Sequence, residues 1–196
     1  MNHMSYIDGT GTVVWEIDTA IVDPILKVDG NYILIAEKGR NKICLYIDNK
    51  LQYDVDDPDT VMSAELSSNG DVVVVTDKSS YRGGISVYNK SGEQIFSWAS
   101  GSDAVICADI SAASRSVAVA LLNSDVTAKT TVQLFNVNET ESYAKIEMPD
   151  TVVYELQFVG DKVNAFGDNR VTGISSSGKI VYDNDFSNVQ LSLIHI

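Results

Sequence analysis

The chain has 196 residues, of which 44% are apolar, and it carries 14 basic against 27 acidic side chains, for a net charge of −13. This length and composition are those of a globular protein with a substantial core. Nucleic acids and anionic membrane surfaces both require a cationic face, so the negative charge argues against either as a partner. No run approaches the roughly 20 apolar residues of a membrane helix, and the sequence itself is of the soluble type.

A unit of four short strands repeats along the chain with a period of about 40 residues, which favours a propeller over a sandwich or a barrel. We therefore expect an all-β fold: a β-propeller fragment of about four four-stranded antiparallel blades plus a leading hairpin, forming an open arc in a single domain, 5–190. The second strands at 32–36, 72–76 and 117–122 are more continuously apolar and are expected near the middle of their sheets. The expected elements are a half-blade at 5–17, blades at 21–55, 61–99, 104–148 and 152–183, and the start of another blade at 186–190.

One aromatic residue recurs on the expected third strand of successive units and another on the fourth strand. Within each hairpin the two lie close enough across the turn for us to expect them on the same face of the sheet. We interpret them as packing residues that fill the wedge between blades, in preference to the alternative of stacking platforms for a ligand such as a sugar. The third-strand residues are Tyr6, Tyr46, Tyr88 and Phe135, and the fourth-strand residues are Trp15, Tyr53, Phe96, Tyr143 and Tyr182.

Polar side chains follow each second strand in matching register. The connections after the second and fourth strands of propeller blades gather on one face, and loops on a rigid scaffold are where function usually lies. We hypothesise that these side chains form a recognition face for a polar ligand or partner; the alternative is that they cap turns. The candidates are Glu37, Arg40, Asp77, Arg82, Asn123, Asp168 and Asn169.

Few residues of the chain are suited to catalysis or metal binding. The two histidines, His3 and His195, lie near the ends, which leaves no base for a nucleophilic triad and no histidine-ligated metal site. The acidic run 54–59 lacks the glycine and the final glutamate of a calcium loop and is interpreted as a solvated connector. Cys44 and Cys107 lie in apolar runs and are interpreted as buried hydrophobic residues. We expect no catalytic residue, no cofactor and no metal.

Two resemblances add to this pattern. The opening Asp8-Gly9-Thr10-Gly11-x-x-x-Trp15 resembles the Asp-x-x-Thr-Gly-x-x-x-Trp docking motif of quinoprotein-type propeller repeats, which are similar in fold to WD-repeat propellers. Segments 31–39, 85–92 and 165–169 resemble, in that order, an uncharacterised bacterial family, and the similarity covers most of 6–183. The family resemblance implies a short cytoplasmic tail, one membrane helix upstream of this chain and an extracytoplasmic propeller-like domain of unknown function. It supplies no catalytic residues.

The last six residues, 191–196, are encoded by CTG TCT CTT ATA CAC ATC if read back into codons, which resembles the end of a common sequencing adapter. We expect them to be an artefact and the gene to continue past Gln190, so that the chain is a fragment.

These features predict a non-catalytic propeller module of the cell envelope that binds a protein or an envelope component through its loop-rich face. The alternative is a propeller enzyme, either a hydrolase or a quinone-dependent oxidoreductase. Such an enzyme would use carboxylates near the propeller axis, for which Asp77 and Asp168 are the candidates.

Overall fold

The computed structural model describes residues 2–125 and 127–186, and the regular elements among them are all β-strands. The chain opens with a two-stranded hairpin and continues into four sheets of four strands, here called blades 1 to 4. The hairpin is β1 (Asn2–Ile7) and β2 (Val13–Thr19), and blade 1 is β3 (Pro24–Asp29), β4 (Tyr32–Glu37), β5 (Lys42–Ile47) and β6 (Lys50–Asp56).

Blades 2 to 4 repeat the same plan. Blade 2 is β7 (Thr60–Leu66), β8 (Val72–Asp77), β9 (Gly84–Tyr88) and β10 (Gln94–Ala99). Blade 3 is β11 (Ala104–Ile110), β12 (Ser116–Asn123), β13 (Lys129–Asn136) and β14 (Ala144–Pro149). Blade 4 is β15 (Val153–Val159), β16 (Lys162–Gly167), β17 (Arg170–Ile174) and β18 (Ile180–Asp185).

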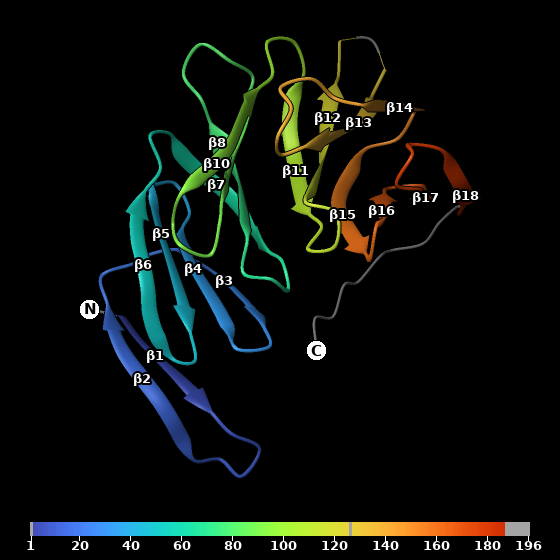
Figure 1. Cartoon of the computed structure of the whole chain (residues 1–196). Coiled ribbons are helices and arrows are strands. Elements are labelled where there is room, and N and C mark those ends of the chain that lie inside the picture. Colours follow the sequence, from blue (N-terminus) through green and yellow to red (C-terminus); the bar gives the residue numbers. More distant parts are fainter. Residues whose placement is uncertain (1, 126, 187–196) are drawn as a thin grey trace.

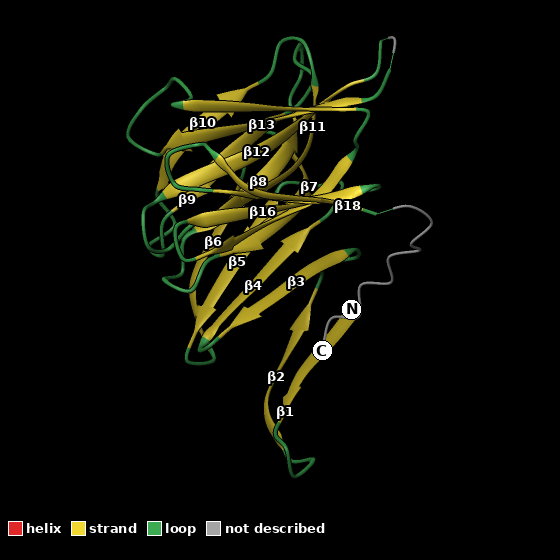
Figure 2. Cartoon of the chain, turned by 90° about the vertical axis from the view of Figure 1, so that its right-hand side faces the viewer, coloured by secondary structure: helices red, strands yellow, loops and turns green. Residues whose placement is uncertain are grey.

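The strands of each blade pair in sequence order, and every neighbouring pair is antiparallel. The blades fan out in an open arc (Figure 1), and a side view shows them stacked face to face with the β1–β2 hairpin at one end (Figure 2). The all-β, open-arc propeller architecture predicted from the sequence is confirmed. The predicted continuation of the chain beyond residue 186 lies outside the described residues. Within them, no helix is long and apolar enough to cross a membrane.

The second strands of blades 1 to 3 are buried on both of their faces, as their continuous apolar sequences predict, whereas buried and partly exposed residues alternate along β16 of blade 4. In β8, Val72 and Val74 belong to the core shared with blade 1, whereas Val73 and Val75 belong to the core shared with blade 3. Side chains alternate between the faces of a strand, so one unbroken valine run serves two interfaces at once. The molecule therefore has one core in each wedge between neighbouring sheets.

Six of the nine predicted aromatics lie in these wedges, which confirms their packing role, whereas Tyr6, Tyr143 and Tyr182 are at least 40% exposed and the prediction is wrong for them. In blades 1 and 2, however, the two aromatics of one blade lie on opposite faces, so the prediction of a shared face is wrong there. Tyr46 packs edge-on against Trp15 of the leading hairpin, with ring centroids 5.1 Å apart. Tyr53, on the other face of blade 1, joins the core that contains Tyr88 of blade 2.

A β-bulge in the outer strand pair causes this reversal. In blade 1, Tyr46 is opposite Leu51 and Leu45 is opposite Tyr53, so Gln52 is an extra residue in the fourth strand. Because side chains alternate along a strand, one extra residue moves every later side chain to the other face.

Blade 2 carries the same irregularity between Gln94 and Phe96. As a result Phe96 packs forward on Phe135 of blade 3, with ring centroids 5.7 Å apart. In each of these two blades, one aromatic therefore packs against the preceding sheet and the other against the following sheet.

The wedge between blades 3 and 4 is filled differently. Tyr143, the fourth-strand aromatic expected there, is 42% exposed. The core of this wedge consists of aliphatic residues such as Leu134, Ile146 and Met148, which pack with blade 4. Gly178 of blade 4 has a positive φ of 76° and lies so close to Ala144 that a side chain on it would collide. Here a close approach of backbones replaces the aromatic pair.

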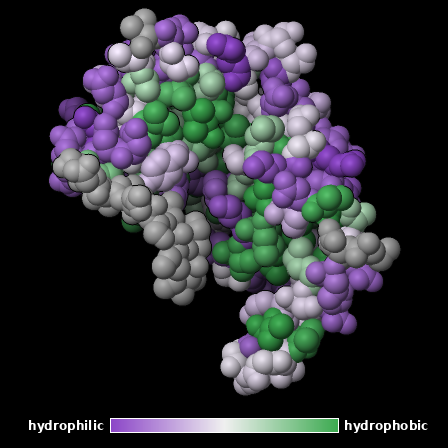
Figure 3. All heavy atoms as spheres, turned by 180° about the vertical axis from the view of Figure 1, so that it is seen from behind, coloured by the Kyte–Doolittle hydropathy of each residue, from purple (hydrophilic) through white to green (hydrophobic). Residues whose placement is uncertain are grey.

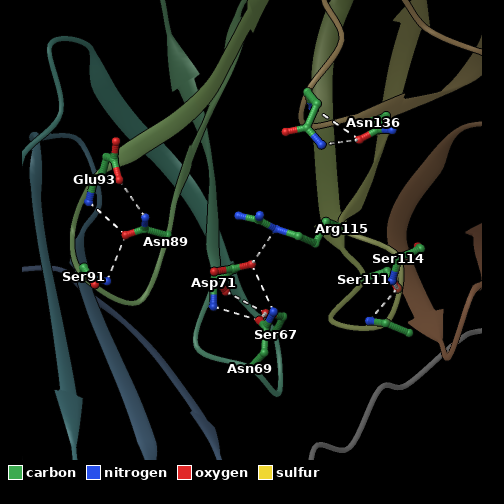
Figure 4. A network of polar contacts seen from close by, with 12 residues as sticks. Ser67, Asn69, Asp71, Asn89, Ser91, Glu93, Ser111, Ser114, Arg115 and Asn136 are labelled. Carbon is green, nitrogen blue, oxygen red and sulfur yellow. Dashed lines mark hydrogen bonds and ion pairs between the residues drawn. The ribbon is translucent and has the colours of Figure 1, made fainter.

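Tight turns on one side of the blades are held by their own polar side chains (Figure 4). The Asn69 side-chain oxygen accepts a hydrogen bond from the Asp71 amide at 3.0 Å, and the Asn89 oxygen accepts one from the Ser91 amide at 2.9 Å. The Arg115 Nε of blade 3 lies 3.7 Å from the Asp71 Oδ2 of blade 2, which ties neighbouring turns together. Asparagine is favoured in such turns because its short side chain caps nearby amides.

Candidate functional site

The connections after the second and fourth strands lie side by side and form the rim of the arc. Backbone hydrogen bonds join them directly: the Gly39 amide donates to the Val61 carbonyl at 2.8 Å, and the Arg82 amide donates to the Ser100 carbonyl at 2.8 Å. The expectation that these two groups of loops share a face is therefore confirmed. The seven predicted candidates are spread around this rim, blade by blade.

In blades 1 and 4 a carboxylate after the second strand braces the start of its own blade. Glu37 Oε1 accepts a hydrogen bond from the Val22 amide at 3.0 Å, and Asp168 Oδ1 accepts one from the Val152 amide at 3.0 Å. Glu37 is 7% exposed. Each carboxylate therefore fixes the residue just before the first strand of its own blade, a contact of longer range than a turn cap.

Two further candidates, Arg40 and Asn169, also make local contacts. Arg40 Nε lies 3.5 Å from Glu37 Oε1, and the Asn169 side-chain oxygen accepts a hydrogen bond from the Thr151 hydroxyl at 3.0 Å. In blade 2, Asp77 is exposed at the end of its strand. The neighbouring Lys78 makes the brace there, with its Nζ 3.0 Å from Asp59 Oδ2.

The other two candidates, Arg82 and Asn123, meet at one loop. Besides its backbone bond, the Arg82 side chain donates from Nε to the Ser102 carbonyl at 3.5 Å. Asn123 donates from Nδ2 to Asp103 Oδ1 at 2.8 Å. The loop 100–103, which connects blade 2 to blade 3, is therefore held from both blades.

This loop is one wall of a groove between blades 2 and 3, with a volume of about 550 Å³. Trp98 and Phe135 line it, with ring centroids 5.1 Å apart and ring planes inclined at 49°. Its volume falls within the range of small-molecule sites. Further lining residues are Leu121, Gln133, Thr140, Glu141, Ser142 and Lys145.

Sequence reasoning did not identify Trp98 as a groove residue. The available signal was its spacing: Trp98 stands two residues after Phe96, and residues two apart on a strand share a face. An aromatic two positions from a wedge residue therefore faces the same wedge, nearer its rim end.

A second, larger cavity of about 680 Å³ lies along the axis of the arc, lined mainly by the first strands of all four blades. Lys27 Nζ pairs with Glu65 Oε1 at 2.8 Å, and Asp109 Oδ2 accepts a hydrogen bond from the Phe158 amide at 2.6 Å. The face drawn in Figure 3 is hollowed between the arms of the arc, and hydrophilic side chains (purple) lie in the hollow.

The axial carboxylates differ from those that the enzyme alternative predicted. Asp77 and Asp168 lie on the rim and do not line the axial cavity, whereas Glu65, Asp109 and Glu155 do. Each of these three interrupts an apolar first strand, and that interruption was the signal that the sequence offered. Burial raises the pKa of Asp109 from its ordinary value of 3.8 to about 7.

Cys44 is buried, as predicted, and Cys107 is partly buried against the core between blades 3 and 4. Both are free, and burial raises the pKa of Cys44 to about 11 and that of Cys107 to about 12, so the thiols stay protonated at neutral pH. Among the described residues no group of three His, Cys, Asp or Glu side chains is placed to hold a metal ion.

The acidic connector 54–59 was predicted to be solvated, and for Asp57 this prediction is wrong. Asp57 is 1% exposed and accepts a hydrogen bond from the Tyr88 hydroxyl at 2.7 Å. The carboxylate satisfies a phenol that the wedge between blades 1 and 2 buries, because a buried hydroxyl without a partner would be costly.

The sequence matches the model of a family described as a family of unknown function (DUF5711) over residues 1–191. The chain belongs to this family. No curated protein matches it. Membership of the DUF5711 family therefore brings no assigned activity with it.

Solved structures show the propeller fold of this DUF5711 chain. BamB from Moraxella catarrhalis aligns with a TM-score of 0.60 and 12% identity over 90% of this chain and 57% of that one. The C-terminal WD40 domain of Sif2 aligns with a TM-score of 0.63 and 14% identity over 95% of this chain and 53% of that one. BBS1N, solved in complex with ARL6DN, aligns with a TM-score of 0.56 and 16% identity over 90% of this chain and 56% of that one. The chain spans about half the length of these structures, and at such identities the likeness shows the fold alone.

Replacement of Glu37 by Ala removes the acceptor of the Val22 amide and should lower the free energy of unfolding by about 1–2 kcal/mol. Asp77→Ala changes the exposed residue at the corresponding position of blade 2 and should stay within about 0.5 kcal/mol of wild type. Urea unfolding of both variants measures the difference. Equal losses would contradict the bracing role of Glu37.

Asp109 should make stability fall as pH rises. Its raised pKa means that the folded protein keeps a proton that the unfolded chain has released, so its contribution is complete below about pH 4 and is lost as the pH passes through about 7. Asp109→Asn retains a hydrogen-bond acceptor for the Phe158 amide but does not titrate. Urea unfolding between these pH values should show a steeper decline for wild type than for the variant, and parallel profiles would contradict the assignment.

Proposed function

We propose that this chain is part of a non-catalytic propeller module of the cell envelope, which binds a protein or another envelope component at its rim. The observation that carries the proposal is the groove between blades 2 and 3. Its wall 100–103 is held by Arg82 from one blade and Asn123 from the other, and Trp98 lines it. A concave site with an aromatic floor and a fixed wall is a pre-organised binding surface.

The rim beside this groove supports a macromolecular partner. Tyr81 is 50% exposed in the loop that precedes Arg82, and aromatic and arginine side chains are enriched where proteins bind one another. Among the structural neighbours, BBS1N was solved in complex with ARL6DN, so a blade arrangement of this kind accommodates a protein partner in that case.

We place the module outside the cytoplasmic membrane of a bacterium, tethered by an anchor that is not part of this chain. The support for this location is the resemblance of segments 31–39, 85–92 and 165–169 to a membrane-anchored bacterial family.

Site-specific photo-crosslinking tests the proposed function in the full-length protein, in the cells that produce it. A photoreactive amino acid at Ser102 or Glu141, both exposed in the walls of the groove, should give a discrete covalent adduct with an envelope component. The same amino acid at Lys90, in a turn on the opposite side of blade 2, is the matched control and should give none. Adducts at Lys90 in place of the groove positions would contradict the proposal.

A further inference from the structure

The groove between blades 2 and 3 has the chemistry of a carbohydrate site, and we propose that it binds a neutral saccharide chain of the cell envelope. The proposal rests on the proposed function, because it names the class of envelope component that the rim would recognise. It depends on three features of the groove: an aromatic platform, a border of hydroxyl and amide groups, and a small net charge.

The platform is Trp98. Its ring lies 5.1 Å from that of Phe135, which is fully buried at 0% exposure in the core between blades 2 and 3. A buried neighbour holds the indole in place, while Trp98 itself is only partly buried and lines the groove. An indole has a flat apolar face and one polar N–H at its edge. The ring of a pyranose offers the complementary surface, a face of C–H groups edged by hydroxyls.

Short polar side chains surround this platform. Hydroxyl groups donate and accept hydrogen bonds, and an amide does both from its two ends, so they pair with sugar hydroxyls in either direction. The groove is formed by side chains on sheet faces and by two loops, which distinguishes it from the open strand edge that an extended peptide uses. The polar residues concerned are Ser102, Thr140, Ser142 and Gln133.

The charges of the groove favour a neutral ligand. Asp103 and Glu141 stand against Lys145, which leaves a net charge of −1 on the lining. A phosphate or a polyanionic chain would need a cationic site. Asp103 is already bonded to Asn123, so its charge-assisted hydrogen bond fixes the wall.

Titration calorimetry of the full-length protein with chitotetraose and with cellotetraose tests the inference. At least one of these neutral oligosaccharides should bind saturably. Trp98→Ala should weaken that binding about tenfold or more, as expected for an aromatic at the centre of a site. Gln133→Ala, which leaves the aromatic core intact, should weaken it by about threefold through the loss of a hydrogen bond. Tyr6→Ala removes an exposed aromatic of the leading hairpin, which does not line the groove, and should leave the affinity unchanged.

Two results would overturn the inference: neither oligosaccharide binds saturably, or binding survives both Trp98→Ala and Gln133→Ala unchanged. Because Trp98 packs on the core, unfolding curves of Trp98→Ala are recorded in parallel. If Trp98→Ala fails to fold, the affinity of Gln133→Ala decides whether the groove binds the saccharide. If photo-crosslinks at Ser102 and Glu141 still capture a protein while no saccharide binds, the proposed rim function stands and the saccharide assignment fails.

Discussion

The arc depends on each blade packing side chains from both of its faces, one face against the preceding sheet and the other against the following sheet. The β-bulge in the outer strand pair solves this in blades 1 and 2, because one extra residue turns the fourth-strand aromatic away from the third-strand aromatic. Tyr53 and Phe96 therefore point forward along the arc, while Tyr46 and Tyr88 point back. Each wedge that they reach receives a ring from both sides, and rings in contact add to the stabilisation from their buried area.

The candidate binding groove follows from the same constraint. Once the bulge has turned Phe96 toward blade 3, Trp98, two residues later, is turned with it and extends the aromatic contact toward the rim. The loop 100–103 leaves the strand just beyond this ring, and Arg82 and Asn123 hold it from either side. Packing between blades and the geometry of the groove are thus two consequences of one irregularity in strand pairing.

The sequence predicted the architecture well because its signals are periodic. The valine run of β8 showed a strand buried on both faces, and the recurring aromatics showed a wedge residue in each of blades 1 to 3. The prediction from sequence failed where a single extra residue changes the pairing register of a strand. Nothing in the sequence marks Gln52 as the extra residue of a bulge. Of the rim candidates, Glu37 accepts a hydrogen bond from the Val22 amide. The sequence shows that a carboxylate ends this strand, but it does not show that the Val22 amide lies beside it.

The central claim is that aromatic residues of successive blades are energetically coupled across the wedge. A double-mutant cycle on Phe96 and Phe135, each replaced by Leu, measures this coupling directly. The ring contact at 5.7 Å predicts a coupling free energy of about 0.5–1.5 kcal/mol. The pair Tyr53 and Phe96, which lie in different wedges, should be additive within about 0.5 kcal/mol. Additivity of Phe96 and Phe135 would contradict the account.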